Sequence, residues 1–595
     1  MRMAVMAAIL AGATSANGAT APARLRVNLG GYHPDDRKVA VLFADRPLSG
    51  SFTVTVVGAQ KPSLTGAIPP RSIGVWGRFR HHYTLDFTAV RAPGTYVLDA
   101  AGASARITIG TSVRDAWPGY LLEHLRQQRC GYNPFLDTVC HPFDGRSAYG
   151  PLPAGTYVDA RGGWHDAGDQ LKYLITSSNA TAQLMMAWHL NPEALKEDRV
   201  DALGHAAPNG DPDVLDEARW GLEWMLRLHP DADQLYHQVA DDRDHIGWKL
   251  PQDDKADYGW GEGKDRVVYA ADGRPQGLGQ HQSQATGIAN LAGRYAAAMA
   301  MAYRAWKDHP RHAGFALRCL QAGREVYALG RAREGSQQGN SYGAPYRYNE
   351  DTWADDMEWG AAEMFKATGD RAYLEDAIRY AHIAGSTSMV GRDTAEHYQY
   401  YPFFNAGHFA LHPLVEEPLK ALLAGYYILG LEAALRRSDA SPYAVGVPFL
   451  WCSNNMAVAL ATQAMLFERM TGLARFRPLA EAQRDWLLGR NPWGTSMFTL
   501  VPDGAESPVD VHLSTTKLTG RGVRGGLVDG PVYARIFESL KGVALSRADA
   551  FADFQGEAVY HDDIADYATN EPTMDGTASA VLLFALMDRT STMPR

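Results

Sequence analysis

The sequence predicts a mainly α-helical protein, in which a helical toroid follows a small all-β sandwich. Three observations carry this prediction: a period-two pattern over residues 24–110, a helical period after about Ser112, and long loops between the helical segments. A chain of 595 residues exceeds what a single hydrophobic core usually supports, so at least two domains are expected.

Residues 1–19 have the layout of a secretory signal peptide. Arg2 precedes the apolar run AVMAAILAGA, and small residues follow, which makes cleavage after Ala16 or Ala19 plausible. This run is too short to span a bilayer, and no later run reaches about 18 apolar residues. We therefore expect an exported protein, periplasmic or secreted, without a membrane span.

Residues 23–110 are predicted to form the β-sandwich. Apolar and polar residues alternate in short segments that Gly, Pro and Asp turns separate, which is typical of strands with one buried face. The segments are LRVNLGGY, KVAVLFA, GSFTVTVV, HHYTLDFT, GTYVLDA and SARITIG.

Residues 115–592 are predicted to form the helical domain. Apolar residues recur at i, i+3, i+4 and i+7 over 115–129, 178–190, 212–229, 285–306, 317–332, 353–369, 371–385, 414–437, 456–472, 478–489 and 577–589. No fixed internal period is visible, which favours a toroid over a solenoid. The long loops at 130–170, 236–283, 338–352 and 490–530 indicate where function lies.

The composition excludes some partners. The net charge is −10 and no run of Lys and Arg is present, so binding to nucleic acid is not expected. A neutral or cationic partner and a monomeric state are expected instead. Four Cys are too few for a disulfide scaffold in a chain of this length.

The segment RGGWHDAGDQLKY, residues 161–173, carries the first candidate for chemistry. Asp166 and Asp169 lie three residues apart on a loop that leads toward a helix. Two carboxylates this close could share one water molecule, one accepting its proton while the other orients it. An N-cap role for an Asp ahead of an apolar helix explains the spacing equally well.

Glu571, in the segment YHDDIADYATNEPTMDGTASAV, is the second candidate. It stands between Tyr567 and the last helix, where a partly dry pocket would raise its pKa and keep it protonated as an acid. A Glu in a first helical turn is the alternative, since the helix dipole favours it there.

Two motifs resemble glycoside hydrolase family nine, whose members are mostly bacterial and plant cellulases. One is GGWHDAGD, and the other is the pattern made by Tyr560, Asp562, Tyr567, Glu571 and Thr573. The likeness extends to RVNLGGYHPDDRKVAVL, DVLDEARWGLEWMLRLH, DTWADDMEWGAAEMFKATGD, VPFLWCSNN and LLGRNPWGTS. It covers essentially the entire mature chain.

The resemblance implies an immunoglobulin-like domain followed by a six-fold α/α toroid of six inner and six outer helices. It also implies that Asp169 activates a water, that Asp166 holds that water, and that Glu571 protonates the departing glycosidic oxygen. Inversion of this kind needs carboxyl groups roughly 6.5–9.5 Å apart. The expected reaction is hydrolysis of β-1,4-glucosidic bonds in cellulose, related β-glucans or cellodextrins, without a catalytic cofactor.

Cys130, Cys140, His141 and His165 offer the ligand set of a structural zinc. A Cys130–Cys140 disulfide is the alternative in an exported protein. Some bacterial relatives with the immunoglobulin-like module have a zinc at similar positions, which favours the metal. Cys319 and Cys452 are expected to be core residues.

One departure from the family concerns the grip on the sugar. Many members carry a His-x-Arg element, whereas this sequence reads SPVDVHLSTTKLTGRG, which keeps His512 but has Ser514 in place of the Arg. Lys517 or Arg521 could reach the same place, although a Lys lacks the planar fork of an Arg. Thr577 stands where the family more often has Asn.

The aromatic side chains Trp164, Trp260, Trp353, Trp451 and Tyr567 are candidates for stacking on sugar faces. A structural role is the alternative for each Trp. The acidic cluster Asp351, Asp355 and Asp356 offers oxygen ligands that suit calcium, and a solvated helix N-terminus explains it equally well.

An endoglucanase acting on a β-glucan is therefore the leading hypothesis. An exo-acting β-glucosidase, cellobiohydrolase or glucosaminidase on short oligosaccharides is the alternative within the same class. A non-catalytic sugar-binding protein and a hydrolase with a catalytic zinc are hypotheses of other classes.

Overall fold

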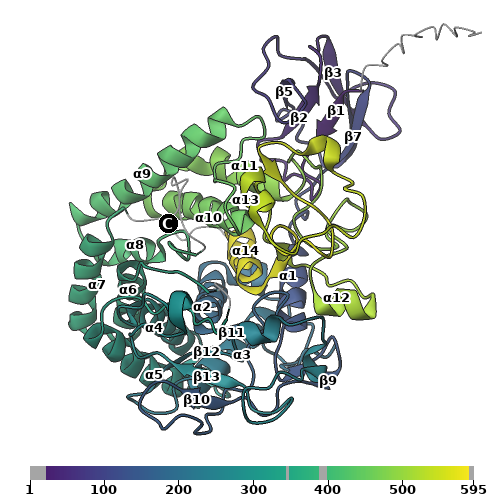
Figure 1. The fold of residues 1–595 in the computed structure, drawn as a ribbon. Coiled ribbons are helices and arrows are strands. Elements are labelled where there is room, and N and C mark those ends of the chain that lie inside the picture. Colours follow the sequence, from purple (N-terminus) through teal and green to yellow (C-terminus); the bar gives the residue numbers. More distant parts are fainter. Residues whose placement is uncertain (1–21, 344–346, 387–397, 589–595) are drawn as a thin grey trace, which may run out of the picture.

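The computed structural model describes residues 22–343, 347–386 and 398–588. It consists of a β-sandwich at one end of a larger helical toroid (Figure 1). The predicted signal peptide at residues 1–19 lies outside the described residues.

The sandwich has two antiparallel sheets, in the orders β1-β2-β5 and β4-β3-β6-β7. Its strands are β1 (Arg24–Arg26), β2 (Val39–Ala44), β3 (Ser51–Val56), β4 (Leu64–Ala67), β5 (His81–Asp86), β6 (Gly94–Ala100) and β7 (Ala103–Ile109). The six segments predicted from the sequence each contain a strand, and only β4 was not expected.

Strand β2 explains why the sandwich and the toroid stay together. All six of its residues are buried. Ala40 and Leu42 face the core of the sandwich, whereas Val41 and Phe43 belong to the core of the toroid. Because successive strand residues point to opposite faces, one apolar strand supplies both cores.

The toroid is built from alternating outer and inner helices. The outer helices are α1 (Trp117–Gln127), α3 (Asp213–Arg227), α5 (Ala313–Ala332), α7 (Arg371–Ala384), α9 (Leu419–Ala440) and α11 (Arg477–Leu487). The inner helices are α2 (Leu174–Leu190), α4 (Ala289–Trp306), α6 (Ala354–Thr368), α8 (Ala406–Leu411), α10 (Ser453–Thr471) and α14 (Met574–Met587). Each inner helix contacts the next, and α14 closes the ring on α2. This is the six-fold α/α toroid that the sequence predicted.

The outer and inner helices differ in their pattern of apolar and small residues. Outer helix α7 buries Leu374, Ala377, Tyr380 and Ala384, one stripe at helical spacing, and leaves its other face exposed. Inner helix α4 is buried on nearly all sides and is rich in Ala. Small residues let inner helices approach closely: a Cβ added at Gly293 would lie 2.2 Å from the carbonyl carbon of Asp356.

The helical pattern located all the long helices correctly and missed the short ones, α8, α12 (Ser514–Thr519) and α13 (Ala534–Ser539). The long loops also contain a four-stranded sheet of β10 (Arg146–Ala148), β13 (Val267–Ala270), β12 (Tyr236–Val239) and β11 (Lys172–Tyr173). Such short elements have too few residues for a visible period and are stabilised by tertiary contacts.

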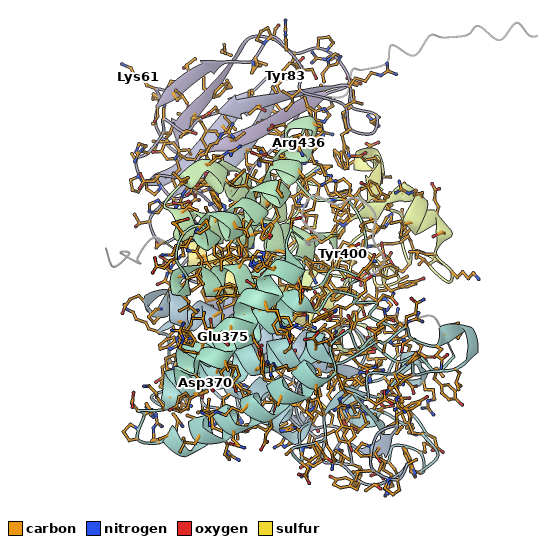
Figure 2. The ribbon with its side chains drawn as sticks, turned by 90° about the vertical axis from the view of Figure 1, so that its left-hand side faces the viewer. Lys61, Tyr83, Asp370, Glu375, Tyr400 and Arg436 are labelled. Atoms are coloured by element: carbon orange, nitrogen blue, oxygen red, sulfur yellow. The ribbon has the colours of Figure 1, made fainter. Side chains whose placement is uncertain are left out.

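Ion pairs join the sandwich to the toroid. Arg484 of α11 donates to Asp36 of the sandwich at 2.9 Å and to Asp485 at 2.7 Å, and both of these partners are buried. Arg114, from the connection ahead of α1, also pairs with Asp36. The turned view places Arg436 of α9 at the end of the toroid beside the sandwich and Asp370 toward the opposite end (Figure 2).

Candidate active site

Two loops distant in sequence bring the predicted catalytic carboxylates together. Asp166 and Asp169 lie just ahead of β11, which runs directly into α2. Glu571 lies just ahead of β17 (Pro572–Thr573), which runs directly into α14. Because α2 and α14 are neighbours in the inner ring, the residues that precede their N-termini meet at one end of the toroid.

Gly168 fixes the distance between these loops. Its backbone N–H donates to Glu571 Oε1 at 2.7 Å. A Cβ at this position would lie 2.5 Å from Glu571 Oε1 and 2.3 Å from the carbonyl oxygen of His512. The motif therefore requires glycine here, because any side chain would push the two loops apart.

A cleft of about 500 Å³ opens at this junction. Its lining includes five residues expected from the sequence, namely Asp169, Trp451, His512, Tyr567 and Glu571. The rings of Trp451 and Tyr567 lie 5.9 Å apart, so an aromatic wall stands beside the carboxyl groups. A volume of this order fits a small ligand such as a short stretch of sugar units.

Glu571 has the environment of an acid. Burial raises its pKa well above the usual range, and the charges of Asp529 and Asp169 add to the shift, although the Gly168 N–H opposes it. A carboxyl group in this environment holds its proton at a pH where an exposed Glu has lost it.

Asp169 is held from two sides at the cleft wall. The backbone N–H of Leu171 donates to its Oδ1 at 2.8 Å, and the His245 ring contacts its Oδ2 at 3.3 Å. His245, together with Trp248 and Lys249, lines the cleft and was not singled out from the sequence. The one signal for these residues was the unusual length of the 236–283 loop that carries them.

Asp166 lies beneath the cleft and is not part of its lining. It is 3% exposed, and the hydroxyl groups of Thr176 and Tyr348 donate to its two carboxylate oxygens. Its backbone oxygen accepts from Met574 N at 2.9 Å, which ties the loop to α14. The expected contact between Asp166 and the reacting water stays a prediction.

The proposed stacking role is wrong for Trp164. This side chain is fully buried, and its indole N–H donates to Glu217 at 2.7 Å, so no sugar can reach it. Trp260 and Trp353 are partly exposed but pack against the core and do not line the cleft. Among the predicted tryptophans, Trp451 is therefore the one in the cleft.

The structure also locates the residues at the altered His-x-Arg element. His512 lines the cleft, with Nδ1 2.7 Å from the carbonyl oxygen of Ile564, and Ser514 lines it as well. Arg521 turns away, because it donates to the carbonyl oxygen of Phe135 and stacks on that ring. Lys541 and Lys249 supply the positive charge along the cleft instead.

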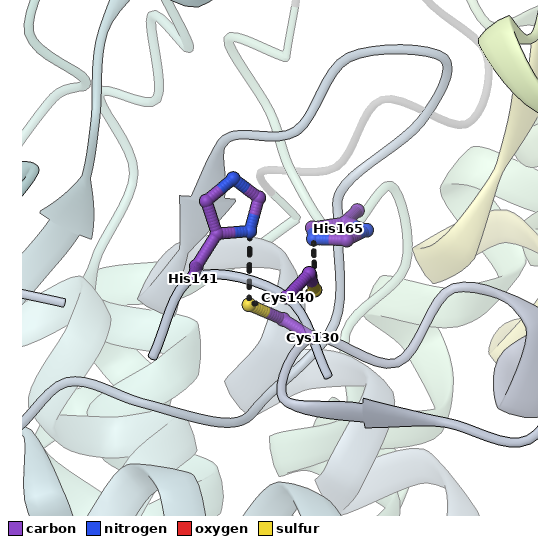
Figure 3. A group of neighbouring side chains, drawn as sticks. All are labelled: Cys130, Cys140, His141 and His165. Carbon is purple, nitrogen blue, oxygen red and sulfur yellow. Dashed lines mark hydrogen bonds between the residues drawn. The ribbon is translucent and has the colours of Figure 1, made fainter. Parts of the chain in front are cut away.

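Cys130, Cys140, His141 and His165 form one cluster (Figure 3). His165 belongs to the catalytic loop, the segment 161–173 that also carries Asp166 and Asp169. Cys130 Sγ lies 3.6 Å from His141 Nδ1, Cys140 Sγ lies 3.7 Å from His165 Nε2, and the two sulfurs are 3.9 Å apart. Both cysteines are free, so the Cys130–Cys140 disulfide alternative is wrong.

These distances fit four ligands around one zinc ion. Ligand atoms about 2.0–2.3 Å from a tetrahedral ion lie roughly 3.5–3.8 Å from one another. His141 also contacts Asp254 through Nε2 at 3.2 Å, the usual second contact of a metal-bound imidazole. Asp254 in turn pairs with the cleft residue Lys249 at 2.7 Å.

The ligand atoms of the acidic cluster do not converge as those of a metal site do in the described ranges. Asp356 pairs with Arg294 at 2.9 Å, and Asp351 accepts from Gln399 at 2.7 Å. Within the described ranges, the groups with converging ligand atoms are the Cys/His cluster and Asp211 with His309 and His312. Asp351, Asp355 and Asp356 belong to neither.

An α/α toroid with two carboxyl groups in one cleft is the arrangement of a glycoside hydrolase. Residues 120–584 match the family model described as Glycosyl hydrolase family 9, and residues 20–105 match the Cellulase N-terminal ig-like domain. The chain belongs to glycosyl hydrolase family 9.

Matches to known relatives cover most of this chain. A xyloglucan-specific endo-β-1,4-glucanase of Bacteroides ovatus is 26% identical over 95% of this chain and 93% of its own. Endoglucanase C of Cellulomonas fimi is 28% identical over 80% of this chain and 44% of its own. A metagenome-derived endoglucanase of glycoside hydrolase family 9 has a TM-score of 0.73 at 27% identity, covering 95% of this chain and 98% of its own.

Within the described ranges, no helix has both the length and the apolar character needed to cross a membrane.

Proposed function

We propose that this protein is an inverting endo-β-1,4-glucanase in which Asp169 is the general base and Glu571 the general acid. One observation carries the assignment: the two carboxyl groups line the same cleft. The backbone N–H of Gly168, the residue before Asp169, donates to the Glu571 carboxylate.

The chemistry follows from the two environments. Asp169 takes a proton from a water that attacks the anomeric carbon, while Glu571 gives its proton to the leaving glycosidic oxygen. Each carboxyl group changes its protonation once, and the anomeric configuration inverts because the water attacks from the face opposite the leaving group. No cofactor takes part in these steps. Asp166 holds the attacking water, and its backbone contact with Met574 positions the loop that carries Asp169.

The substrate class rests on the family and on the cleft. The relatives named above are endoglucanases, one of them specific for xyloglucan, and Trp451 with Tyr567 supplies an aromatic wall suited to a glucan chain. Ser514 in place of the usual Arg changes the grip on the sugar beside the cut.

The test is to incubate the enzyme with cello-oligosaccharides, xyloglucan oligosaccharides and chitosan oligosaccharides, and to follow product length and anomeric configuration by proton NMR. We expect internal cleavage of a β-glucan with the α-anomer as the first product. Release of single units from one end would replace the endo mode with an exo mode. A β-anomer as first product would overturn inversion.

We further propose that Cys130, Cys140, His141 and His165 hold a structural zinc. The sulfur and imidazole donors suit this ion, which would tie the 130–141 loop to the catalytic loop. Metal analysis should give one zinc per chain, and cobalt substitution should give the spectrum of a tetrahedral thiolate site. Chelation should lower the melting temperature, because the bound ion stabilises the folded state. Loss of activity at an unchanged melting temperature would instead indicate a catalytic metal.

We also propose that residues 1–19 are an export signal and that the mature chain has two domains, residues 23–110 and 115–592. The period-two pattern that ends at 110 and the helical pattern that follows support this boundary. N-terminal sequencing of the exported protein and limited proteolysis test these limits.

A further inference from the structure

We infer that Asp529 is a positioning residue that keeps Glu571 protonated for its role as the acid. This inference rests on the proposed function of Glu571 and adds a residue that the sequence motifs did not indicate. Asp529 follows β14 (Leu527–Val528), which pairs with β17 beside Glu571.

Strand register places the two carboxyl groups side by side. In the antiparallel pair, Val528 is opposite Pro572, so the next pair outward is Asp529 and Glu571. The Asp529 N–H donates to the Glu571 carbonyl oxygen at 2.9 Å, which continues the ladder by one residue. Directly opposed residues have Cβ atoms about 4.5–5.5 Å apart and side chains on the same face.

Asp529 is 1% exposed and does not line the cleft. Its Oδ2 accepts from the Trp451 indole N–H at 3.1 Å, and its Oδ1 accepts from the Cys452 thiol at 3.2 Å. The groups that act most strongly on it are these two donors and the carboxyl groups of Asp575 and Asp566, none of them cationic. Among the described residues, no Arg or Lys forms an ion pair with this buried carboxyl group or is one of its strongest neighbours.

The proton of this pair belongs on Glu571. Two carboxyl groups on directly opposed strand residues in a dry site resist carrying two negative charges together. Asp529 accepts two side-chain hydrogen bonds that favour its charged form, whereas Glu571 accepts one from Gly168 and faces the cleft. The charge therefore settles on Asp529, and the proton stays where a glycosidic oxygen can take it.

Other titratable groups face this pair from each element packed against it. They are Asp166 and Asp169 of the catalytic loop, Asp244 and His245, Cys452, His512, Lys541, Asp566 and Tyr567, and Asp575 of α14. Asp529 is distinguished from them because it alone is paired with Glu571 through the strand register.

The first test is the pH profile of kcat/KM for Asp529→Asn on the β-glucan that the parent hydrolyses. The alkaline limb reports ionisation of the acid. Removing the neighbouring charge should move this limb down by about 1–2 pH units, a ten- to hundredfold loss at alkaline pH. The acid limb should stay in place. An unmoved alkaline limb would overturn the inference.

Trp451→Phe is the matched control. It removes the N–H that Asp529 accepts but keeps the carboxyl group. If Asp529 acted only by orienting Trp451, both variants would lose activity equally at every pH, and the inference would fail. We expect the downward shift of the alkaline limb in Asp529→Asn alone, because Trp451→Phe keeps the Asp529 carboxyl group and its charge.

A second measurement needs neither substrate nor a folded Asp529 variant. In the parent protein labelled with ¹³C at the glutamate carboxyl carbons, the signal lost in Glu571→Gln identifies Glu571. We expect this signal to titrate above the ordinary range and in two steps, the first as Asp529 ionises. One step near the ordinary value of about 4.3 would overturn the inference. Absence of β-glucan hydrolysis would instead contradict the proposed function.

Discussion

The protein buries carboxyl groups in two regions, the interface between sandwich and toroid and the floor of the cleft. At the interface, Asp36 and Asp485 meet the guanidinium group of Arg484. In the cleft floor, Asp529 and Glu571 meet neutral N–H and S–H donors and each other. Asp529 is as deeply buried as Asp36, and Glu571 is partly exposed in the cleft wall, so the partners are the main difference between the regions.

The partners decide the protonation state. Burial alone would raise the pKa of Asp36, yet Arg484 and Arg114 outweigh it and hold that pKa below the usual range. Burial raises the pKa of Glu571, and its carboxylate neighbours raise it further. The interface charges therefore stabilise the fold, whereas the cleft carboxyl groups are kept reactive at some cost in stability.

The largest expected effect comes from the cleft. Glu571→Gln and Asp169→Asn should each lower kcat by about 10²–10⁴, because each removes a proton-transfer group without changing side-chain size. Steady-state hydrolysis of a soluble β-glucan measures the loss, and thermal unfolding checks that the variants remain folded. Near-normal turnover by either variant would show that its carboxyl group is not the acid or base.

A substitution at the interface should have an effect of comparable size, but on the stability of the fold and not on turnover. Arg484→Met should cost about 3–5 kcal/mol in the free energy of unfolding, because it removes the buried cation that Asp36 and Asp485 share and leaves each with a single cationic neighbour, Arg114 and Arg490 respectively. Urea unfolding measures this cost. The turnover of the folded fraction should stay the same, and a selective loss of kcat would mean that the interface reaches the cleft.

A smaller effect separates cleft aromatics from aromatics elsewhere. Trp451→Ala should lower kcat/KM roughly tenfold, the value of one lost stacking contact. Trp260→Ala is the matched control and should leave kcat/KM within about twofold. Equal losses in both variants would place a second part of the substrate beside Trp260.

The smallest effects concern the pH dependence of stability, where the two regions should have opposite signs. The depressed pKa of Asp36 contributes stability above its unfolded value of about 3.9, which is lost as pH falls. The raised pKa of Glu571 contributes stability below about 4.3, which is lost as pH rises through the folded value.

Urea unfolding of Asp36→Asn, Glu571→Gln and the parent between about pH 2 and 8 tests this difference, because the Asp36 contribution is lost only below its unfolded value. The deficit of Asp36→Asn should shrink toward acid pH, and Glu571→Gln should gain on the parent toward alkaline pH. The gain of Glu571→Gln in the free energy of unfolding is at most about 1.4 kcal/mol for each pH unit between the unfolded and folded pKa of Glu571. If the free energy of unfolding changed with pH in the same way in both variants, the proposed difference between the two regions would be wrong.

The sequence motifs located much of the site because they combine special residues at fixed short spacing. GGWHDAGD placed Asp169 and Gly168 on one loop, and Cys130, Cys140 and His141 together with His165 indicated a metal cluster. The same reasoning failed for Trp164, since the motif does not reveal that Glu217 of α3 accepts its indole N–H. His245 was missed because its partner Asp169 lies in another loop.

The sequence by itself determined the long helices, the sandwich strands and the identity of the two carboxylates that we propose as acid and base. Periodicity and short motifs are local, so they remain readable along the chain. Only the tertiary structure decided that α14 closes on α2, that Asp529 stands beside Glu571, and which buried carboxyl groups meet a guanidinium. Protonation and burial depend on neighbours distant in sequence, and those neighbours exist only once the ring has closed.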